Sequence, residues 1–292
     1  MTKFEHYKNG DLSAFTHEDY STLIHGKDIP LKESDSVNLD KSQISEFETV
    51  FESLKGEPKT LRVRNSKEFN IKALIKFKAE NSRGDPKLFK KQINTNSGNI
   101  YLLIDGSGSM RGSRAKQVRN LTANIMKSIE EIPRINLKAY VYAGDFDNCD
   151  NLCIQEIENV NDCQYITADG YSYGSTPTHN AINFIKEKHE NDTGKKLLIV
   201  LTDGYPMIYH EHNILSSLRN QLNLETKRAC VELEAKEFNL FGIGINAGNT
   251  KTFENNFRDN FVNVESDESG SFSDNIKKHL VSKMSEFVGL IR

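Results

Sequence analysis

The sequence predicts an α/β fold built on a doubly wound, mainly parallel sheet. From about residue 98 onward, short apolar runs rich in β-type residues alternate with helical patterns, which is typical of this architecture. Two of the runs, 101–104 and 197–201, are apolar throughout, as expected of central strands that are covered on both faces. Each run leads into a carboxylate followed by a glycine, so the chain is expected to turn sharply there.

Bulk composition excludes several classes of function. The chain has 292 residues, of which 37% are hydrophobic and 27% charged, a balance typical of a globular protein. A net charge of -3 provides no basic footprint for nucleic acid. No apolar run is long enough to span a membrane, and the first residues lack the pattern of a signal peptide, so a cytoplasmic protein is expected.

The first 95 residues are expected to form an N-terminal extension to a main domain over 96–292. Apolar residues at helical spacing predict a helix over 42–54. The segment 70–79 fits a helix and a strand equally, and 87–93 is a candidate edge strand whose lysines discourage further pairing. The extension is interpreted as a segment that packs on the main domain, with a partner-binding arm as the alternative.

The main domain is predicted to alternate strands and helices. A strand ending at Asp105 leads through a Gly/Ser loop into an amphipathic helix over 113–131, which Pro133 closes. The remaining predicted elements are strands over 137–143, 154–157 and 164–167, a helix beginning at 177–178, a strand over 196–202, a helix over 213–236, a strand over 238–245, a helix over 250–257, a strand over 261–264 and a helix over 273–290.

Oxygen-bearing side chains follow the first central strand. Asp105, Ser107 and Ser109 occupy alternate positions, so in an extended loop their side chains share one face. Gly106 and Gly108 let the loop bend. Carboxylate and hydroxyl oxygens are hard ligands, which suit Mg²⁺ or Mn²⁺ far better than zinc or copper. The pattern therefore predicts a divalent-cation site at the carboxyl end of this strand.

Two later loops carry matching side chains. Thr176 lies in a glycine-containing loop before a helix, and Asp203 follows the second central strand. In doubly wound sheets, ligands bind beyond the carboxyl ends of the strands, so these loops are expected to meet the first one. Asp145, after another strand, and His179, one turn beyond Thr176, are candidates for the rim or outer layer of the site. For His179, a capping or solvent-facing role is favoured over a place at the rim.

These residues resemble the metal-ion-dependent adhesion site (MIDAS) of von Willebrand factor A (VWA) domains. That pattern is D-x-S-x-S, then a Thr in a Gly-rich loop, then an Asp after a buried strand. The resemblance implies a Rossmann-like fold and a Mg²⁺ (or Mn²⁺) site that Ser107, Ser109 and Thr176 bind directly. Asp105 and Asp203 would act largely through water. Such a site leaves the cation short of anionic ligands, so it takes a carboxylate from another protein.

The stretches LLIDGSGSMRG, GSTPT, LLIVLTDGYPM and FGIGI, with GDPKLFKK upstream, resemble the C-terminal domain of the cobaltochelatase subunit CobT. They also resemble NorD-type activators, over about residues 60–292. Two features depart from the pattern. Gly174-Ser175-Thr176 has one glycine where two are common, and the long amino-terminal and acidic regions of full chelatase subunits are missing. Both departures argue against a literal chelatase role.

The resemblance implies a non-catalytic adaptor that works with a MoxR- or chelatase-type AAA+ ATPase and grips an acidic residue of the ATPase or its client. The sequence contains no G-x-x-x-x-G-K-[ST] motif, so the chain is not expected to hydrolyse ATP itself. The alternatives are a noncatalytic subunit of a cobalt or magnesium chelatase, an adhesion-type ligand-binding module at the cell surface, and a phosphotransferase with Asp105 as nucleophile. The protein is not expected to bind nucleic acid or a membrane.

Three weaker patterns elsewhere in the sequence are interpreted as structural or surface features and not as binding sites. The clustered cysteines at 149, 153 and 163 match no common zinc-ligand spacing. His210 and His212 form a pattern that is common on polar surfaces. Gly242 and Gly244 are expected to be packing glycines in a buried strand and not part of a nucleotide loop.

Overall fold

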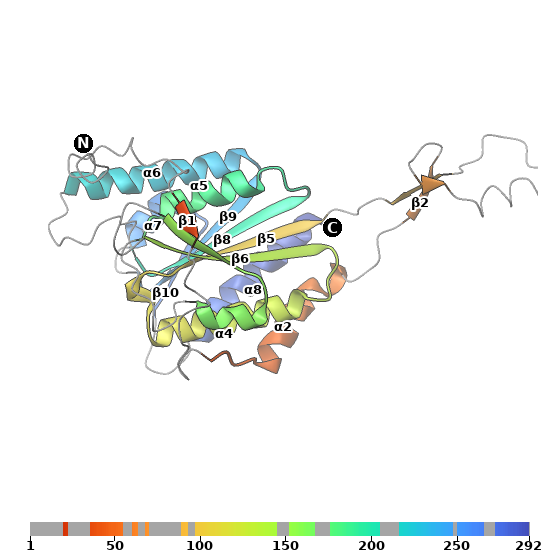
Figure 1. Cartoon of the computed structure of the whole chain (residues 1–292), viewed down its shortest axis with the longest axis horizontal. Coiled ribbons are helices and arrows are strands. Elements are labelled where there is room, and N and C mark those ends of the chain that lie inside the picture. Colours follow the sequence, from red (N-terminus) through yellow and green to blue (C-terminus); the bar gives the residue numbers. More distant parts are fainter. Residues whose placement is uncertain are drawn as a thin grey trace, which may run out of the picture.

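The structure is a computed structural model that describes residues 20–22, 36–54, 60–63, 68–69, 89–92, 97–144, 152–166, 176–204, 216–247, 250–265 and 272–291. A seven-stranded sheet in the order β1-β7-β6-β5-β8-β9-β10 forms the middle layer. Helices α5, α6 and α7 lie on one side of this sheet, and α2, α4 and α8 lie on the other (Figure 1). The predicted α/β fold is therefore confirmed.

The bounds of the elements agree closely with the predicted pattern. The strands of the main sheet are β1 (Tyr20–Thr22), β5 (Gly98–Asp105), β6 (Ile135–Gly144), β7 (Leu152–Ile157), β8 (Lys195–Thr202), β9 (Phe238–Ile245) and β10 (Phe261–Val264). The helices are α2 (Lys41–Phe51), α4 (Ser113–Ile129), α5 (Thr178–His189), α6 (Ser216–Ala235), α7 (Thr250–Phe257) and α8 (Phe272–Ile291). Single 3-10 turns are η2 (Glu52–Leu54), η3 (Gly108–Met110) and η4 (Val160–Tyr165).

A hydrophobic core lies on each face of the sheet, and strand β5 contributes to both. All of its residues are buried, because helices cover both faces. Side chains alternate between the faces of a strand. Ile100, Leu102 and Ile104 accordingly join the core beside α2, α4 and α8, whereas Tyr101 and Leu103 join the core beside α5, α6 and α7. The pairs β5·β6, β5·β8 and β8·β9 are parallel, and β7 runs antiparallel to β6.

Helix α2 of the N-terminal extension is part of the main body. Asp40 caps its first turn by accepting hydrogen bonds from the backbone N–H groups of Ser42 and Gln43. Phe47 and Phe51 are completely buried in the core shared with α4 and α8. The described part of the extension over 36–54 therefore packs on the main domain, as the simpler interpretation of the sequence expected.

Two predictions of local structure are wrong. Of the strand predicted over 164–167, the described residues 164–166 do not form a strand, because Asn159 caps the 3-10 helix η4 by accepting from the N–H groups of Asn161 and Asp162. The strand β4 (Phe89–Gln92) is not an edge, because it lies between β2 (Thr60–Val63) and β3 (Glu68–Phe69) in a separate antiparallel sheet. The ambiguous segment 70–79 lies outside the described residues.

Candidate functional site

The candidate site lies where β5 and β8, two adjacent parallel strands, end at the same edge of the sheet. Asp105 is the last residue of β5, and Asp203 directly follows β8. From β5 the chain crosses by α4 to β6 on one side, whereas α5, on the opposite face, leads into β8 on the other side. This is a switch point of a doubly wound sheet, where ligands typically bind.

Asp105 ties the two strand ends together. Its side chain has no exposed surface. Its Oδ1 accepts a hydrogen bond of 2.8 Å from the backbone N–H of Ser107, and its Oδ2 accepts one of 2.6 Å from the hydroxyl of Thr202. Burial, followed by the neighbouring Asp203 carboxylate, raises the pKa of Asp105 to about 7, although these hydrogen bonds oppose the shift. A cation bound nearby would instead stabilise the charged form of both carboxylates and lower this pKa.

The two serines connect Asp105 to the second carboxylate. The hydroxyl oxygens of Ser107 and Ser109 are 3.0 Å apart. The hydroxyl of Ser109 donates a hydrogen bond of 2.7 Å to Oδ1 of Asp203. Burial raises the pKa of Asp203, whereas Ser109 and Arg114 lower it. The structure thus gathers four of the five predicted ligand residues in one hydrogen-bonded cluster.

Thr176, the fifth residue, lies beside the loop that follows β8. It is 4% exposed, and its hydroxyl oxygen would be 3.8 Å from a Cβ atom placed on Gly204. Its carbonyl accepts a hydrogen bond of 2.8 Å from the N–H of Thr178 at the start of α5. The Thr178 hydroxyl in turn lies 3.1 Å from the hydroxyl of Tyr142, near the end of β6. Helix α5 and strand β6 therefore hold the Thr176 loop at the same edge of the sheet.

Arg114, in the first turn of α4, was not predicted from the sequence. One of its guanidinium nitrogens donates to Oδ2 of Asp203 at 2.5 Å and to the carbonyl of Ser109 at 3.0 Å. Its side chain is 33% exposed, whereas that of Asp203 is 1% exposed. Its position five residues after Ser109 indicates that it lies near the loop, but nothing in the sequence pairs it with Asp203. Thr202 was missed as well, although it directly precedes Asp203.

The oxygen donors fit a small divalent cation. Mg²⁺ binds oxygen at about 2.0–2.1 Å in octahedral geometry, which places adjacent ligands roughly 3 Å apart. The separation of 3.0 Å between the Ser107 and Ser109 hydroxyl oxygens matches that spacing. Within the part of the chain that the structure describes, no three His, Cys, Asp or Glu residues are grouped to hold a metal ion. The donors here are hydroxyls with two carboxylates, which suits a hard cation and not zinc.

The family model of the von Willebrand factor type A domain matches residues 99–275, which contain every residue of this cluster. The chain belongs to this family. Inter-alpha-trypsin inhibitor heavy chain 4 of Mus musculus is 25% identical over 149 residues, and the match covers 46% of this chain but only 16% of the mouse protein. Modules of this family serve in protein interaction and adhesion.

Solved structures similar to this VWA chain include two bacterial proteins. One is the vWF domain of the type V pili tip protein Mfa5 from Porphyromonas gingivalis, with a TM-score of 0.45, 10% identity, and coverage of 67% of this chain and 96% of that chain. The other is an aerotolerance-related membrane protein from Bacteroides fragilis, with a TM-score of 0.42, 15% identity, and coverage of 64% and 100%. None of the described helices of the VWA chain is long and apolar enough to cross a membrane.

The structure describes only some of the other predicted candidates. Asp145, Cys149, His210 and His212 lie outside those residues. Cys153 and Cys163 are buried, free cysteines of β7 and η4. His179 lies in the first turn of α5 and is 6% exposed, so the suggestion that it faces solvent is wrong. Its Nδ1 is buried without a hydrogen-bond partner.

Because the imidazole of His179 is buried, the stability of the VWA domain is expected to depend on pH. Burial lowers the pKa of His179 from 6.5 to about 4, so the unfolded chain binds a proton in a pH range where the folded chain does not. Its contribution is complete above pH 6.5 and is lost as the pH falls toward 4. We expect the wild type to lose roughly 1–3 kcal/mol more than His179→Gln across this window, in urea unfolding series. Parallel pH profiles for the two proteins would contradict the assignment.

Proposed function

We propose that this VWA domain is a non-catalytic interaction module that uses Mg²⁺ (or Mn²⁺) to grip an acidic residue of a partner protein. The observation that carries the proposal is the pair of serine hydroxyl oxygens 3.0 Å apart, joined through Ser109 to Asp203. Ser107, Ser109 and Thr176 would hold the cation directly. Asp105 would contribute charge without direct binding, because Ser107 and Thr202 already occupy both of its oxygens.

Because its ligands are neutral hydroxyls, the arrangement favours a partner that supplies a carboxylate. Of the two carboxylates, Asp105 is fully buried and Asp203 is held by Arg114. A bound cation would supply Lewis acidity with its positive charge only partly neutralised, and so attract an external carboxylate. Arg114 remains one-third exposed beside the cluster, which adds a second positive group that favours an acidic partner. The Ser109 hydroxyl is hydrogen-bonded to Asp203, but Arg114 offsets the charge of that carboxylate and weakens it as a general base, which supports binding and not catalysis.

For the partner we propose a MoxR- or chelatase-type AAA+ ATPase or its client. The support is the similarity of the four sequence stretches around the site to CobT-like and NorD-like proteins. The chain would act as an adaptor in the cytoplasm, presenting its cation to an acidic residue on the ATPase assembly. A noncatalytic role in a true chelatase remains the alternative, and the identity of the captured protein separates the two.

The test is affinity purification from the source cell with Mg²⁺ or EDTA, read by mass spectrometry. We expect an AAA+ ATPase to be captured by the wild type in Mg²⁺ and to be lost in EDTA or with Ser109→Ala. Ser282→Ala, an equal change at an exposed position on α8, is the control and should capture normally. Recovery of a large chelatase subunit would favour the alternative, and undiminished capture in EDTA and by Ser109→Ala would overturn the proposal.

Arg114 is expected to restrain the affinity for the cation. Its guanidinium neutralises Asp203 and repels a second positive charge, so Arg114→Gln should tighten Mg²⁺ binding severalfold, on the order of 1 kcal/mol. Lys116→Gln removes the same charge from an exposed position of α4 and should change the affinity far less. Calorimetric titration with Mg²⁺ measures both variants. Equal effects would mean that only the net charge of the chain matters.

A further inference from the structure

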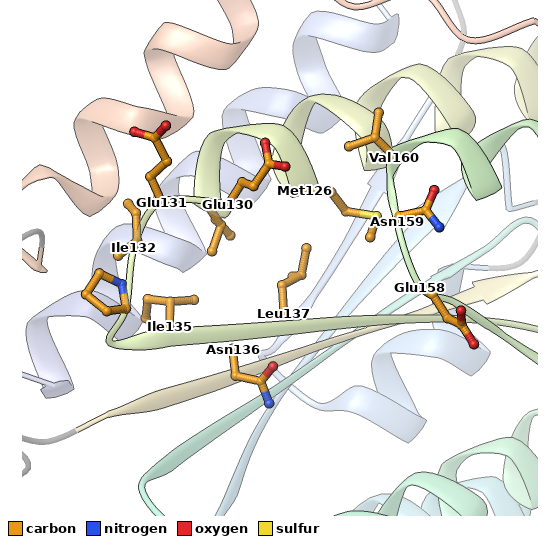
Figure 2. A pocket seen from close by; sticks show the side chains of 12 residues that line it. Met126, Glu130, Glu131, Ile132, Ile135, Asn136, Leu137, Glu158, Asn159 and Val160 are labelled. Carbon is orange, nitrogen blue, oxygen red and sulfur yellow. The ribbon is translucent and has the colours of Figure 1, made fainter.

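A concave region, distinct from the candidate site, lies at the start of β6, the opposite end of this strand from Tyr142. A cavity of about 600 Å³ opens between the end of α4, the start of β6 and the turn η4 (Figure 2). Met126 from α4 and Leu137 from β6 both line it. Its apolar lining consists of Met126, Ile129, Ile132, Pro133, Ile135, Leu137 and Val160. The cavity therefore combines apolar and polar lining groups and is open to solvent.

Beside the cavity, β6 has an open edge. Strand β7 pairs with β6 only from Ala139 to Gly144, so among the described residues no strand covers 135–138 on this side. The carbonyls of Arg134 and Tyr142 accept hydrogen bonds from β5 residues or the loop after them, at Gly98 and Gly106. Alternation along the strand then places the backbone N–H and C=O of Leu137 on the open side. The N–H of Ile135 on this side is already bonded to the carbonyl of Ile132, so the free positions centre on Leu137 and offer a template for a short added strand.

The charged residues that line the cavity are all acidic. Glu130, Glu131 and Glu158 line it, and no lysine or arginine is among the lining residues. Glu130 forms an ion pair with Lys127. For Glu131 and Glu158, no ion-pair partner is found in the described ranges. An occupant with basic residues at its ends would therefore meet complementary charge.

We propose that the open edge of β6 and this cavity bind an extended segment of a partner protein by strand addition, in line with β7. The segment would carry apolar residues at alternate positions, flanked by lysine or arginine. Ile135, Ala139 and Val141 belong to the core on the α4 side. The added apolar side chains on that face would enter the cavity, while the basic residues lie near Glu131 and Glu158. This surface is separate from the cation site and does not depend on the proposed function.

The test uses the full chain and the heptapeptide acetyl-Lys-Thr-Leu-Thr-Val-Thr-Lys-amide, whose apolar residues alternate between basic ends. We expect the peptide to slow amide hydrogen exchange at Leu137 at least tenfold, in the presence of Mg²⁺ and of EDTA alike. The double variant Glu131→Lys/Glu158→Lys should bind the peptide at least tenfold more weakly. Glu254→Lys, the same change at an exposed position on α7, should alter the affinity less than twofold.

A second peptide, N-methylated at alternate residues, removes the backbone donors while keeping the side chains. It should bind at least tenfold more weakly than the unmodified peptide. Equal binding of both peptides, or binding without protection of Leu137, would overturn strand addition. Protection of Leu137 that exists before peptide is added would also overturn the proposal. If that protection rises with protein concentration the occupant is a second copy, and if it does not the occupant is a segment of the chain itself.

Discussion

Asp105→Asn is expected to abolish the stabilisation of the protein by Mg²⁺ without destabilising the metal-free form. For the wild type, Mg²⁺ at one hundred times its dissociation constant should add about 2.7 kcal/mol to the free energy of unfolding. The variant should gain less than about 0.5 kcal/mol under the same conditions. Urea unfolding with Mg²⁺ or EDTA measures both quantities. A variant that still gains the full increment would remove Asp105 from the cation site.

The metal-free comparison separates a role in cation binding from a structural one. The pKa of Asp105 is raised from 3.8 to about 7, so the unfolded chain releases this proton at lower pH than the folded chain does. Without a cation, the wild type should therefore lose stability relative to Asp105→Asn as the pH rises from 4 to 7. Asparagine keeps an oxygen for the Ser107 N–H but carries no charge. A metal-free variant that is markedly less stable at pH 7 would indicate a structural role alone.

Gly242→Ala is expected to lower the free energy of unfolding by about 1–3 kcal/mol. A Cβ atom on Gly242 would lie 2.8 Å from Cγ of Phe257 and 2.9 Å from Cδ2 of Phe261. Both rings are packed against further aromatic neighbours, with Phe253 stacked on Phe261 at 5.2 Å between centroids, so neither ring has free space to move into. The expected role of Gly242 as a packing glycine is thus confirmed by the structure.

Gly289→Ala provides a matched control for that experiment. A Cβ atom there would meet nothing within 4 Å, and the residue lies inside α8. Alanine in an exposed helical position is favoured over glycine, so this variant should gain roughly 0.5–1 kcal/mol. Chemical denaturation of the two variants side by side isolates the steric term, since both add one methyl group. Similar behaviour of the two would show that β9 relaxes around the added atom.

The elements of the main sheet could be predicted because each signal was local. The apolar runs in β5 and β8 and the stripe of α4 depend only on burial and period, and α7 and β10 were predicted to the residue. Ser107, Ser109 and Asp203 were assigned to one site because parallel strands end at one edge of a sheet, and their hydrogen bonds now join them. Asp145 and the partner remain predictions.

Other features depended on contacts between distant segments. Arg114 meets Asp203 across 89 residues of sequence, and nothing in its neighbourhood specifies that pairing. The burial of His179 follows from how α5 packs on the sheet and not from its own flanking residues. Likewise, the open edge of β6 exists because β7 stops at Ile157, where Asn159 turns the chain into η4. A sequence pattern gives the period of a strand, but it does not give the length of its partner.

The packing of α2 against α8 shows that the stable folding unit extends beyond the residues that match the family. Residues 99–275 match the family, yet Phe47 and Phe51 before them, and Leu280 and Phe287 after them, fill one continuous core. An ion pair of 3.0 Å between Glu46 and Lys277 joins the two flanking helices directly. Helices α2 and α8 thus close the α4 side of the sheet against each other. A fragment cut at the family boundaries would leave that side as an exposed apolar surface, so the independently stable unit is larger than the family match.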